Sequence, residues 1–284
     1  MAGNREFQMY GTVSWLGGFP NLLKNENRRW WGTRLWLIQF LLFLVIVNGV
    51  VFVVYRTPVE EMYGPDSENA SQAEQAEMQT MKQKPELIGL IPYMRLAGLV
   101  MVVGVVVVTQ SALISEKQSG TAAWILSKPV SRSAFVLSKV AGYGLGIFGV
   151  MCVLLGAVLY GQIWLTTGVR IPLLLYAGML SLVFLNLLFY LTLTILLGAL
   201  FNSRGAVLGI PFILLFGYML IPGIPAWLAQ IMPWNLLDTL AYPALALTVV
   251  QGQPLPTLTP ILATIISCVL FTVLALWKFN REEF

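Results

Sequence analysis

Six long stretches without a charged residue alternate with shorter charged segments along the chain. They cover residues 35–55, 96–115, 140–169, 171–203, 205–237 and 239–277. A helix that crosses the roughly 30 Å hydrocarbon core of a bilayer needs about 20 residues, so each stretch is long enough to span it. The pattern predicts six transmembrane helices, at about 35–55, 93–115, 139–165, 171–201, 205–222 and 257–277.

The last two stretches are too long for one span each, and six prolines lie near or between the two predicted helices. These are Pro222, Pro225, Pro233, Pro243, Pro254 and Pro256. Proline interrupts helices, so we expect residues 223–256 to form short broken helices that dip into the outer membrane interface. Backbone at that depth must be buried in protein or face water. Residues 56–92 are polar and acidic and are expected to form an outer loop.

Composition supports a membrane protein, because only 11% of the 284 residues are charged and 57% are hydrophobic. An ordinary soluble domain has about 25% charged residues. The predicted fold class is therefore an all-α integral membrane protein with a single transmembrane domain. The chain has no histidine, and both cysteines, Cys152 and Cys268, lie in apolar runs. Neither a metal site nor a disulfide scaffold is expected.

Basic residues predict the orientation in the membrane. Twelve of the 17 lysines and arginines lie before span one, between spans two and three, between spans four and five, or after span six. Loops rich in Lys and Arg stay in the cytoplasm, so both termini should be cytoplasmic, including a short tail at 278–284. A bacterial inner (plasma) membrane is the expected location.

Residues 1–34 combine apolar and basic positions ahead of the first span. The apolar positions near helical spacing are Trp15, Leu16, Phe19, Leu22 and Leu23. Trp30 and Trp31 follow at the level expected for lipid headgroups. This pattern is typical of a helix that lies in the inner interface. A plain membrane-proximal anchor is the alternative interpretation.

Several kinds of chemistry have no residues to support them. No phosphate-binding G-x-x-x-x-G-K-[ST] loop occurs, so ATP would have to be hydrolysed by another subunit. No Asp or Glu falls within the predicted spans, which disfavours proton- or sodium-coupled carriers. Lys139 is expected at a helix end, where its ammonium can reach the interface. We predict no catalytic residue, no cofactor in this chain and no nucleic-acid partner.

Uncharged polar residues and glycines enter the predicted spans. The polar ones are Asn48, Thr109, Gln110, Ser111, Asn186, Thr192 and Thr194. Hydrogen bonding between helices explains most of them, and a substrate pathway is the other interpretation for Asn48 and Gln110. Gly142, Gly144, Gly146 and Gly149 at span three, and Gly205 with Gly209 at span five, indicate close helix contacts. These contacts could lie within one subunit or between two.

The loop between spans two and three contains the most informative pattern. Pro129 disfavours helical geometry at the residue before it, so a helix from about residue 115 should end by Ser127. Ser131 is then placed to cap the next helix. Thr121, Trp124 and Ile125 would share one face of the short helix. With Glu116, Lys117 and Arg132 at its rim, this face predicts a docking element for a soluble partner. A basic turn that only sets topology is the alternative.

The same loop resembles a known family. Glu116 followed by Gly120-Thr121, the run Leu126-Ser127-x-Pro129-Val130-Ser131-Arg132, and then Lys139 are similar to the E-x-x-x-G-T … L-S-x-P-[VI]-S-R … K signature. This signature belongs to six-helix permease subunits of the second ABC exporter superfamily. The resemblance implies a dimer of two permease copies with cytoplasmic ATP-binding cassette subunits docked on a coupling helix.

The resemblance also implies roles for individual residues. Coupling to the ATPase is carried over to Glu116, Gly120, Thr121, Ser127, Pro129 and Arg132. Trp124 lies at the centre of the same segment, where it departs, with its neighbours Ala122 and Ala123, from the leucine-rich centre of relatives. A substrate path at the dimer interface would involve spans one, two and five, and Asn48 and Gln110 fall on the first two.

These observations together predict the permease subunit of an ATP-driven ABC exporter. Its cargo would be hydrophobic or amphipathic, such as a drug, lipid, peptide or glycan, moved by alternating access at the dimer interface. ATP and Mg would be bound by the partner subunit. A membrane scaffold that recruits a cytoplasmic partner and a small ion-coupled carrier are the alternatives, and the missing carboxylates count against the carrier.

Overall fold

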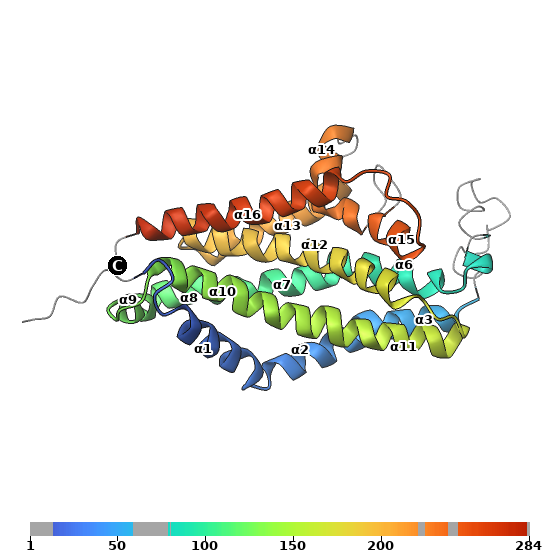
Figure 1. The fold of residues 1–284 in the computed structure, drawn as a ribbon, viewed down its shortest axis with the longest axis horizontal. Coiled ribbons are helices and arrows are strands. Elements are labelled where there is room, and N and C mark those ends of the chain that lie inside the picture. The colour runs from blue at the N-terminus through green and yellow to red at the C-terminus, as the bar shows by residue number, and fades with distance from the viewer. Residues whose placement is uncertain (1–13, 59–78, 80, 221–224, 238–243, 283–284) are drawn as a thin grey trace, which may run out of the picture.

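The computed structural model describes the chain except for residues 1–13, 59–78, 80, 221–224, 238–243 and 283–284. In these described residues every regular element is a helix. The long helices run roughly along one axis and form an elongated bundle (Figure 1). The short helix α9 and the C-terminus lie at one end, and α15 lies toward the other end.

Five helical segments are long and apolar enough to cross a membrane. They are Leu35–Arg56, Leu87–Gln118, Arg132–Thr167, Leu173–Leu200 and Thr259–Asn280. A sixth apolar helix, α13 (Arg204–Leu220), occupies the place of predicted span five, but its apolar part in the described residues, Arg204–Gly217, is shorter than a full span. The chain is therefore a multi-pass helical protein; its described residues contain five helices of full span length, with α13 at the place of the fifth predicted span.

Several spans consist of consecutive helical elements. The N-terminal half contains α1 (Phe19–Trp31), α2 (Leu35–Phe43), η1 (Leu44–Asn48), α3 (Gly49–Arg56), α6 (Leu87–Leu96), η3 (Ala97–Met101), α7 (Val102–Thr109), α8 (Ser111–Gln118) and α9 (Thr121–Leu126). The remainder contains α10 (Arg132–Ile147), η4 (Phe148–Leu154), α11 (Leu155–Thr167), α12 (Leu173–Leu200), α13, α14 (Ala226–Ile231), η5 (Pro233–Leu236), α15 (Leu245–Val250) and α16 (Thr259–Asn280). The short elements α14, η5 and α15 agree with the broken helices predicted within 223–256.

The helix that contains the second predicted span begins at Leu87, six residues before the expected start of the span at about residue 93. Pro92 lies inside α6 instead of closing the outer loop. The turn before Pro92 stays helical because Leu87 and Leu90 are buried in the core, and this packing outweighs the local preference of the proline. Much of the predicted outer loop, residues 59–78 and 80, lies outside the described residues.

Helix α12 is the centre of the bundle. In its most apolar window 72% of the residues are buried, against 22% in the first and last spans. It contacts α16, α15, α7, α13 and α10. The first and last spans therefore expose most of their apolar side chains to lipid or to another protein.

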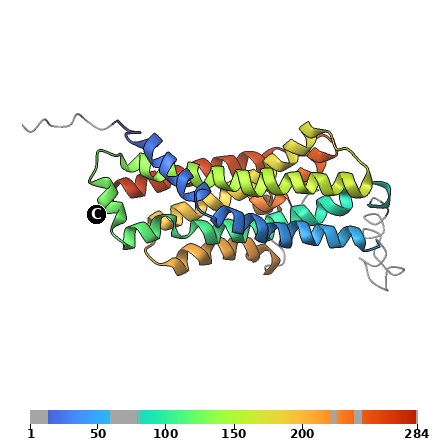
Figure 2. The ribbon, with the colours of Figure 1, turned by 90° about the horizontal axis from the view of Figure 1, so that it is seen from below.

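Helix α1 packs obliquely across the start of α10 (Figure 2). The contact uses a row of glycines on the third span. A Cβ atom at Gly142 would approach Glu26, one at Gly146 would overlap the ring of Trp30, and one at Gly149 would approach Trp31. Absence of side chains lets the two helices come close, as in other small-residue helix contacts. These glycines thus make an intramolecular contact, and α1 is held by protein rather than only by lipid.

Candidate functional site

Helix α9 projects from one end of the bundle, between α8 and α10. Gly120 separates it from α8 with a left-handed backbone at φ +71°, a conformation that glycine adopts without steric cost. The helix predicted to run unbroken from about residue 115 to Ser127 is therefore two helices, and its predicted end is correct. The Ser119-Gly120 pair is a turn signal that the sequence offered.

One exposed side chain on α9 and three in the segment that follows it form a surface that we call the α9 surface. Its residues are Trp124, Ser127, Lys128 and Pro129. Trp124 is 62% exposed. The Lys128 ammonium lies 3.6 Å from the centre of the Trp124 ring, and the Ser127 hydroxyl donates to the Trp124 backbone oxygen at 2.7 Å. Ile125, which was predicted to share this face, instead packs against the core.

The chain beyond the α9 surface is fixed by Ser131. Its side chain accepts a hydrogen bond from the Ala134 N–H at 3.0 Å, which confirms the predicted cap of α10. Its hydroxyl also donates to the backbone oxygen of Trp15 at 2.6 Å, and its N–H donates to that of Gly17 at 3.0 Å. The segment that leads into α1 is thereby attached to the elbow between α9 and α10.

Two basic side chains attach the same region to the C-terminal end of the chain. Arg132 donates to the backbone oxygens of Asn280 and Glu282, at 2.9 and 2.6 Å. On α8, the Lys117 ammonium lies 2.7 Å from the Glu282 carboxylate and donates to the Ala199 backbone oxygen at 3.3 Å. Both sides of α9 are thus fastened to the ends of α12 and α16.

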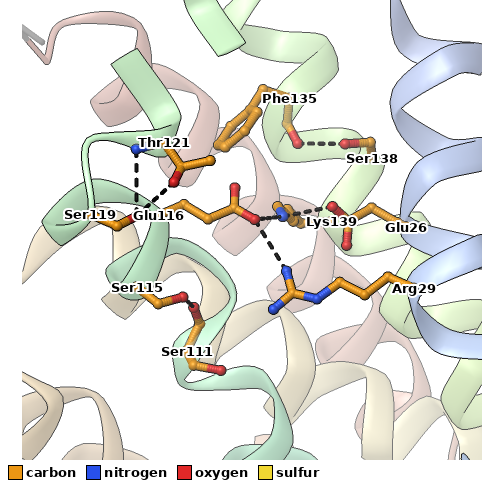
Figure 3. A network of polar contacts seen from close by, with 10 residues as sticks. All are labelled: Glu26, Arg29, Ser111, Ser115, Glu116, Ser119, Thr121, Phe135, Ser138 and Lys139. Atoms are coloured by element: carbon orange, nitrogen blue, oxygen red, sulfur yellow. Dashed lines mark hydrogen bonds and ion pairs between the residues drawn. The ribbon is translucent and has the colours of Figure 1, made fainter. Parts of the chain in front are cut away.

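Beneath α9 lies a group of four ionised residues, Glu26, Arg29, Glu116 and Lys139, which we call the Lys139 ion network. The Lys139 ammonium contacts the Glu26 carboxylate at 2.6 Å and also contacts Glu116. Arg29 reaches the same oxygen of Glu116 at 3.4 Å. Figure 3 shows the ammonium between the two carboxylates, which come from α1 and α8. The network joins three helices that are far apart in sequence.

The burial of this network corrects two expectations. Lys139 is only 1% exposed, so it does not reach the interface as predicted. Glu116 is also buried and points inward toward Lys139, not to the rim of an exposed docking surface. A charge in such surroundings is tolerated only when it is paired and hydrogen-bonded. Glu116 therefore positions α8 against α1 and α10, and any effect on a docked partner is indirect.

Comparison with known families decides the class of protein. Residues 21–284 match the family described as ABC-2 family transporter protein. The chain belongs to the ABC-2 transporter family. This family supplies the membrane subunit of ABC transporters, in which ATP hydrolysis resides in separate ATP-binding subunits. No curated protein matches the chain.

The ABC-2 permease brings together most of the residues that its sequence singled out. Gly120, Thr121, Trp124, Ser127 and Pro129 all lie at the α9 end of the bundle, with Arg132 at the start of α10. The Thr121 hydroxyl lies 2.7 Å from that of Ser119 and stabilises the turn at Gly120. Their proposed contact with an ATP-binding subunit stays a prediction.

The Asn48 side chain is buried inside the permease. It is 1% exposed and donates to the Leu155 backbone oxygen and to the Gln162 side chain, both at 3.3 Å. Gln162 donates back to the Asn48 backbone oxygen at 3.0 Å. These contacts support the interhelical hydrogen-bond interpretation. Gln110 lies between α7 and α8, and its buried side-chain oxygen has no hydrogen-bond partner in the part of the chain that the structure describes.

Replacing Asn48 with leucine should therefore have a small effect. Hydrogen bonds between membrane helices contribute about 0.6 kcal/mol on average, so we expect a slightly lower melting temperature in detergent and unchanged ATPase activity of the assembled transporter. Leu155→Ala is the packing control, because it shortens the neighbouring side chain but keeps the backbone oxygen to which Asn48 donates. Loss of ATP-dependent activity in Asn48→Leu at wild-type stability would instead support a pathway role.

Sequence reasoning missed Glu26 as a partner of Lys139 and Arg29 as a partner of Glu116. Glu26 is the only acidic residue in α1, and it lies between Lys24 and Arg28. A single carboxylate inside a basic amphipathic helix was an available signal for a buried ion pair. The partner on α10 could not be identified from the sequence, because it depends on how α1 crosses that helix.

Proposed function

We propose that this chain is the permease subunit of an ATP-driven exporter and that its ATP-binding subunit docks on the α9 surface. One observation carries the proposal: the α9 surface is exposed, while the chain on both sides of it is fastened to α1, α10, α12 and α16. An exposed aromatic side chain on a rigid support is the usual anchor of a protein interface.

The supports of α9 suggest how a docked subunit would move the membrane helices. Helix α8 continues from α7 through the single residue Gln110, and α10 continues into η4 and α11. A displacement of α9 would therefore act directly on the second and third spans. The Lys139 ion network would carry the same displacement to α1, because it joins α1 to both helices.

A second copy of the chain would pack against α13. Gly205, Gly209 and Gly217 follow each other at intervals of four or eight residues, and a Cβ atom at any of them would meet nothing within 4 Å. Ile213, on the same face, is 72% exposed. Small residues on an uncovered membrane helix favour close association with another helix. We propose that two copies form the substrate path along this face, together with the first and second spans.

The remaining features suit an exporter of hydrophobic or amphipathic molecules. Residues that face away from the core on the first span are apolar, for example Leu41, Val45 and Phe52. The α9 end carries Lys117, Lys128 and Arg132, and the positive-inside rule supports a cytoplasmic position for it; the membrane we propose is a plasma membrane. ATP binding by the partner would then favour one access state over the other, as any population shift requires.

Trp124→Ala tests the docking site. Truncating a central aromatic anchor typically costs 2 kcal/mol or more of binding energy, a loss of about 30-fold in affinity. We expect the tagged wild-type chain, extracted in mild detergent, to retain an ATPase with a phosphate-binding loop, and Trp124→Ala to lose most of it. Mass spectrometry of the copurifying chains measures both.

Trp227→Ala is the matched control, because Trp227 is 66% exposed but lies in α14. It should retain the ATPase in full. Equal retention by both variants would contradict docking on the α9 surface. Recovery of a partner without ATPase activity, lost in Trp124→Ala, would instead support a scaffold.

A further inference from the structure

A cavity of about 280 Å³ lies where α1 meets the first, second and third spans. A water molecule occupies about 30 Å³, so this space is far larger than a single structural water requires. Its polar and aromatic lining comprises Glu26, Arg29, Trp30, Trp36, Gln39 and Tyr143. The coupling proposal above does not use this cavity.

The walls of the cavity present both signs of charge. Arg29 is the exposed member of the Lys139 ion network, with 56% of its side chain accessible, and Glu26 is 92% buried. Two carboxylates and two cations make the network neutral overall. An anion or a cation alone would unbalance it, whereas a molecule that carries both charges would not. A zwitterion therefore fits better than an ion of either sign.

Further groups in the lining are ready to bind a polar ligand. The Trp30 indole N–H and the Gln39 side-chain oxygen are buried and have no hydrogen-bond partner among the described residues. Such orphaned groups are rare in folded proteins, because each costs free energy. Trp30 and Tyr143 also stand edge to face, with their ring centres 5.5 Å apart. Tryptophan and tyrosine rings attract ammonium groups, especially next to a carboxylate.

The position of the cavity indicates where its ligand comes from. Trp31 and Trp36 lie in contact at the junction of α1 and α2, with ring centres 5.7 Å apart, and tryptophans gather at the level of lipid headgroups. Leu35 and Val107 also line the cavity and are 58% and 46% exposed. Polar groups inside and exposed apolar groups at the margin match a molecule with a charged head and apolar tails.

We propose that this cavity binds the headgroup of a zwitterionic phospholipid. Arg29 receives the phosphate, since a guanidinium pairs with phosphate through two hydrogen bonds. Glu26 and the aromatic rings receive the ammonium, and the acyl chains leave past Leu35 and Val107. Because Glu26 and Arg29 also hold α8 and α10, the bound lipid fastens α1 to the spans it contacts. The site lies apart from the α9 surface but shares Glu26 and Arg29 with the Lys139 ion network.

Native mass spectrometry of the delipidated full-length chain tests this site. The probes are dioleoylphosphatidylethanolamine, dioleoylphosphatidylglycerol, dioleoylglycerol and soluble phosphoethanolamine. We expect one phosphatidylethanolamine per chain, bound at least about tenfold more tightly than the other three. Arg29→Gln should weaken this binding about tenfold, because it removes a charge-assisted contact.

Two more variants separate the site from general effects. Arg28→Gln removes a neighbouring exposed arginine that does not line the cavity, and it should bind the lipid like the wild type. Ser111→Leu fills the cavity without removing a charge and should also weaken binding about tenfold. Equal binding of phosphatidylglycerol, or unchanged binding in Ser111→Leu, would overturn the proposal. Tight binding of phosphoethanolamine alone would replace the lipid with a soluble zwitterion.

Discussion

Replacing Lys139 with methionine should destabilise the protein by about 3–5 kcal/mol, the usual cost of removing one partner from a buried ion pair. Methionine is similar in length and apolar, so packing is largely kept. What changes is that Glu26 and Glu116 lose the ammonium that lies between them. Two carboxylates would then face each other in a buried site, where Arg29 is the one remaining cation paired with them among the described residues.

The measurement is the fraction of monodisperse protein that survives heating in detergent. The control is the triple variant Lys139→Met, Glu26→Gln and Glu116→Gln, which removes the lysine and both negative charges together. It should recover most of the lost stability, because replacing a whole buried ionic group is often neutral. If Lys139→Met alone melts like the wild type, the network does not stabilise this junction.

Gly146→Leu should displace α1 from the third span. A Cβ atom at Gly146 already overlaps the indole ring of Trp30, and leucine adds three further carbon atoms. Overpacking of this kind costs about 1–3 kcal/mol when neighbours can adjust. Here the backbone of α1 must move, and the contacts of Glu26 with Lys139 would break with it. We expect lower thermal stability and faster proteolysis at residues 14–31.

Gly161→Leu is the matched control on the same span. Gly161 lies in α11, and a Cβ atom there meets nothing within 4 Å. This variant should be as stable as the wild type or slightly more stable, because leucine favours helix more than glycine does. A similar loss of stability in both variants would mean that glycine is needed for some reason other than contact with α1.

The membrane fold was largely predictable because its main determinant is local. Long uncharged stretches can satisfy their backbone groups in lipid only as helices, so hydropathy locates them without knowledge of the packing. The helices at the first and fourth predicted spans have bounds within two residues of the predicted ones. The helix at the second predicted span begins six residues before the predicted start, because burial of Leu87 and Leu90 extends the helix on the N-terminal side of Pro92.

The coupling region shows the same division. The ends of its helices could be predicted from residue type: Pro129 ends the preceding helix, and Ser131 caps α10. The interruption at Gly120 was missed, since glycine permits a left-handed backbone without requiring one. Which face of α9 is exposed was only partly predicted. Trp124 faces outward, but Ile125 packs inward against neighbours that are distant in sequence.

By itself, the amino-acid sequence determined that this is a multi-pass helical protein and indicated the loop that resembles an ABC permease. Only the tertiary structure decided that Glu26 and Glu116 are buried partners of Lys139, and that α1 packs on the third-span glycines. Hydropathy and helix termination depend on neighbours along the chain. Ion pairs and cavities depend on the angle and register at which helices cross, which arise from packing across the whole bundle.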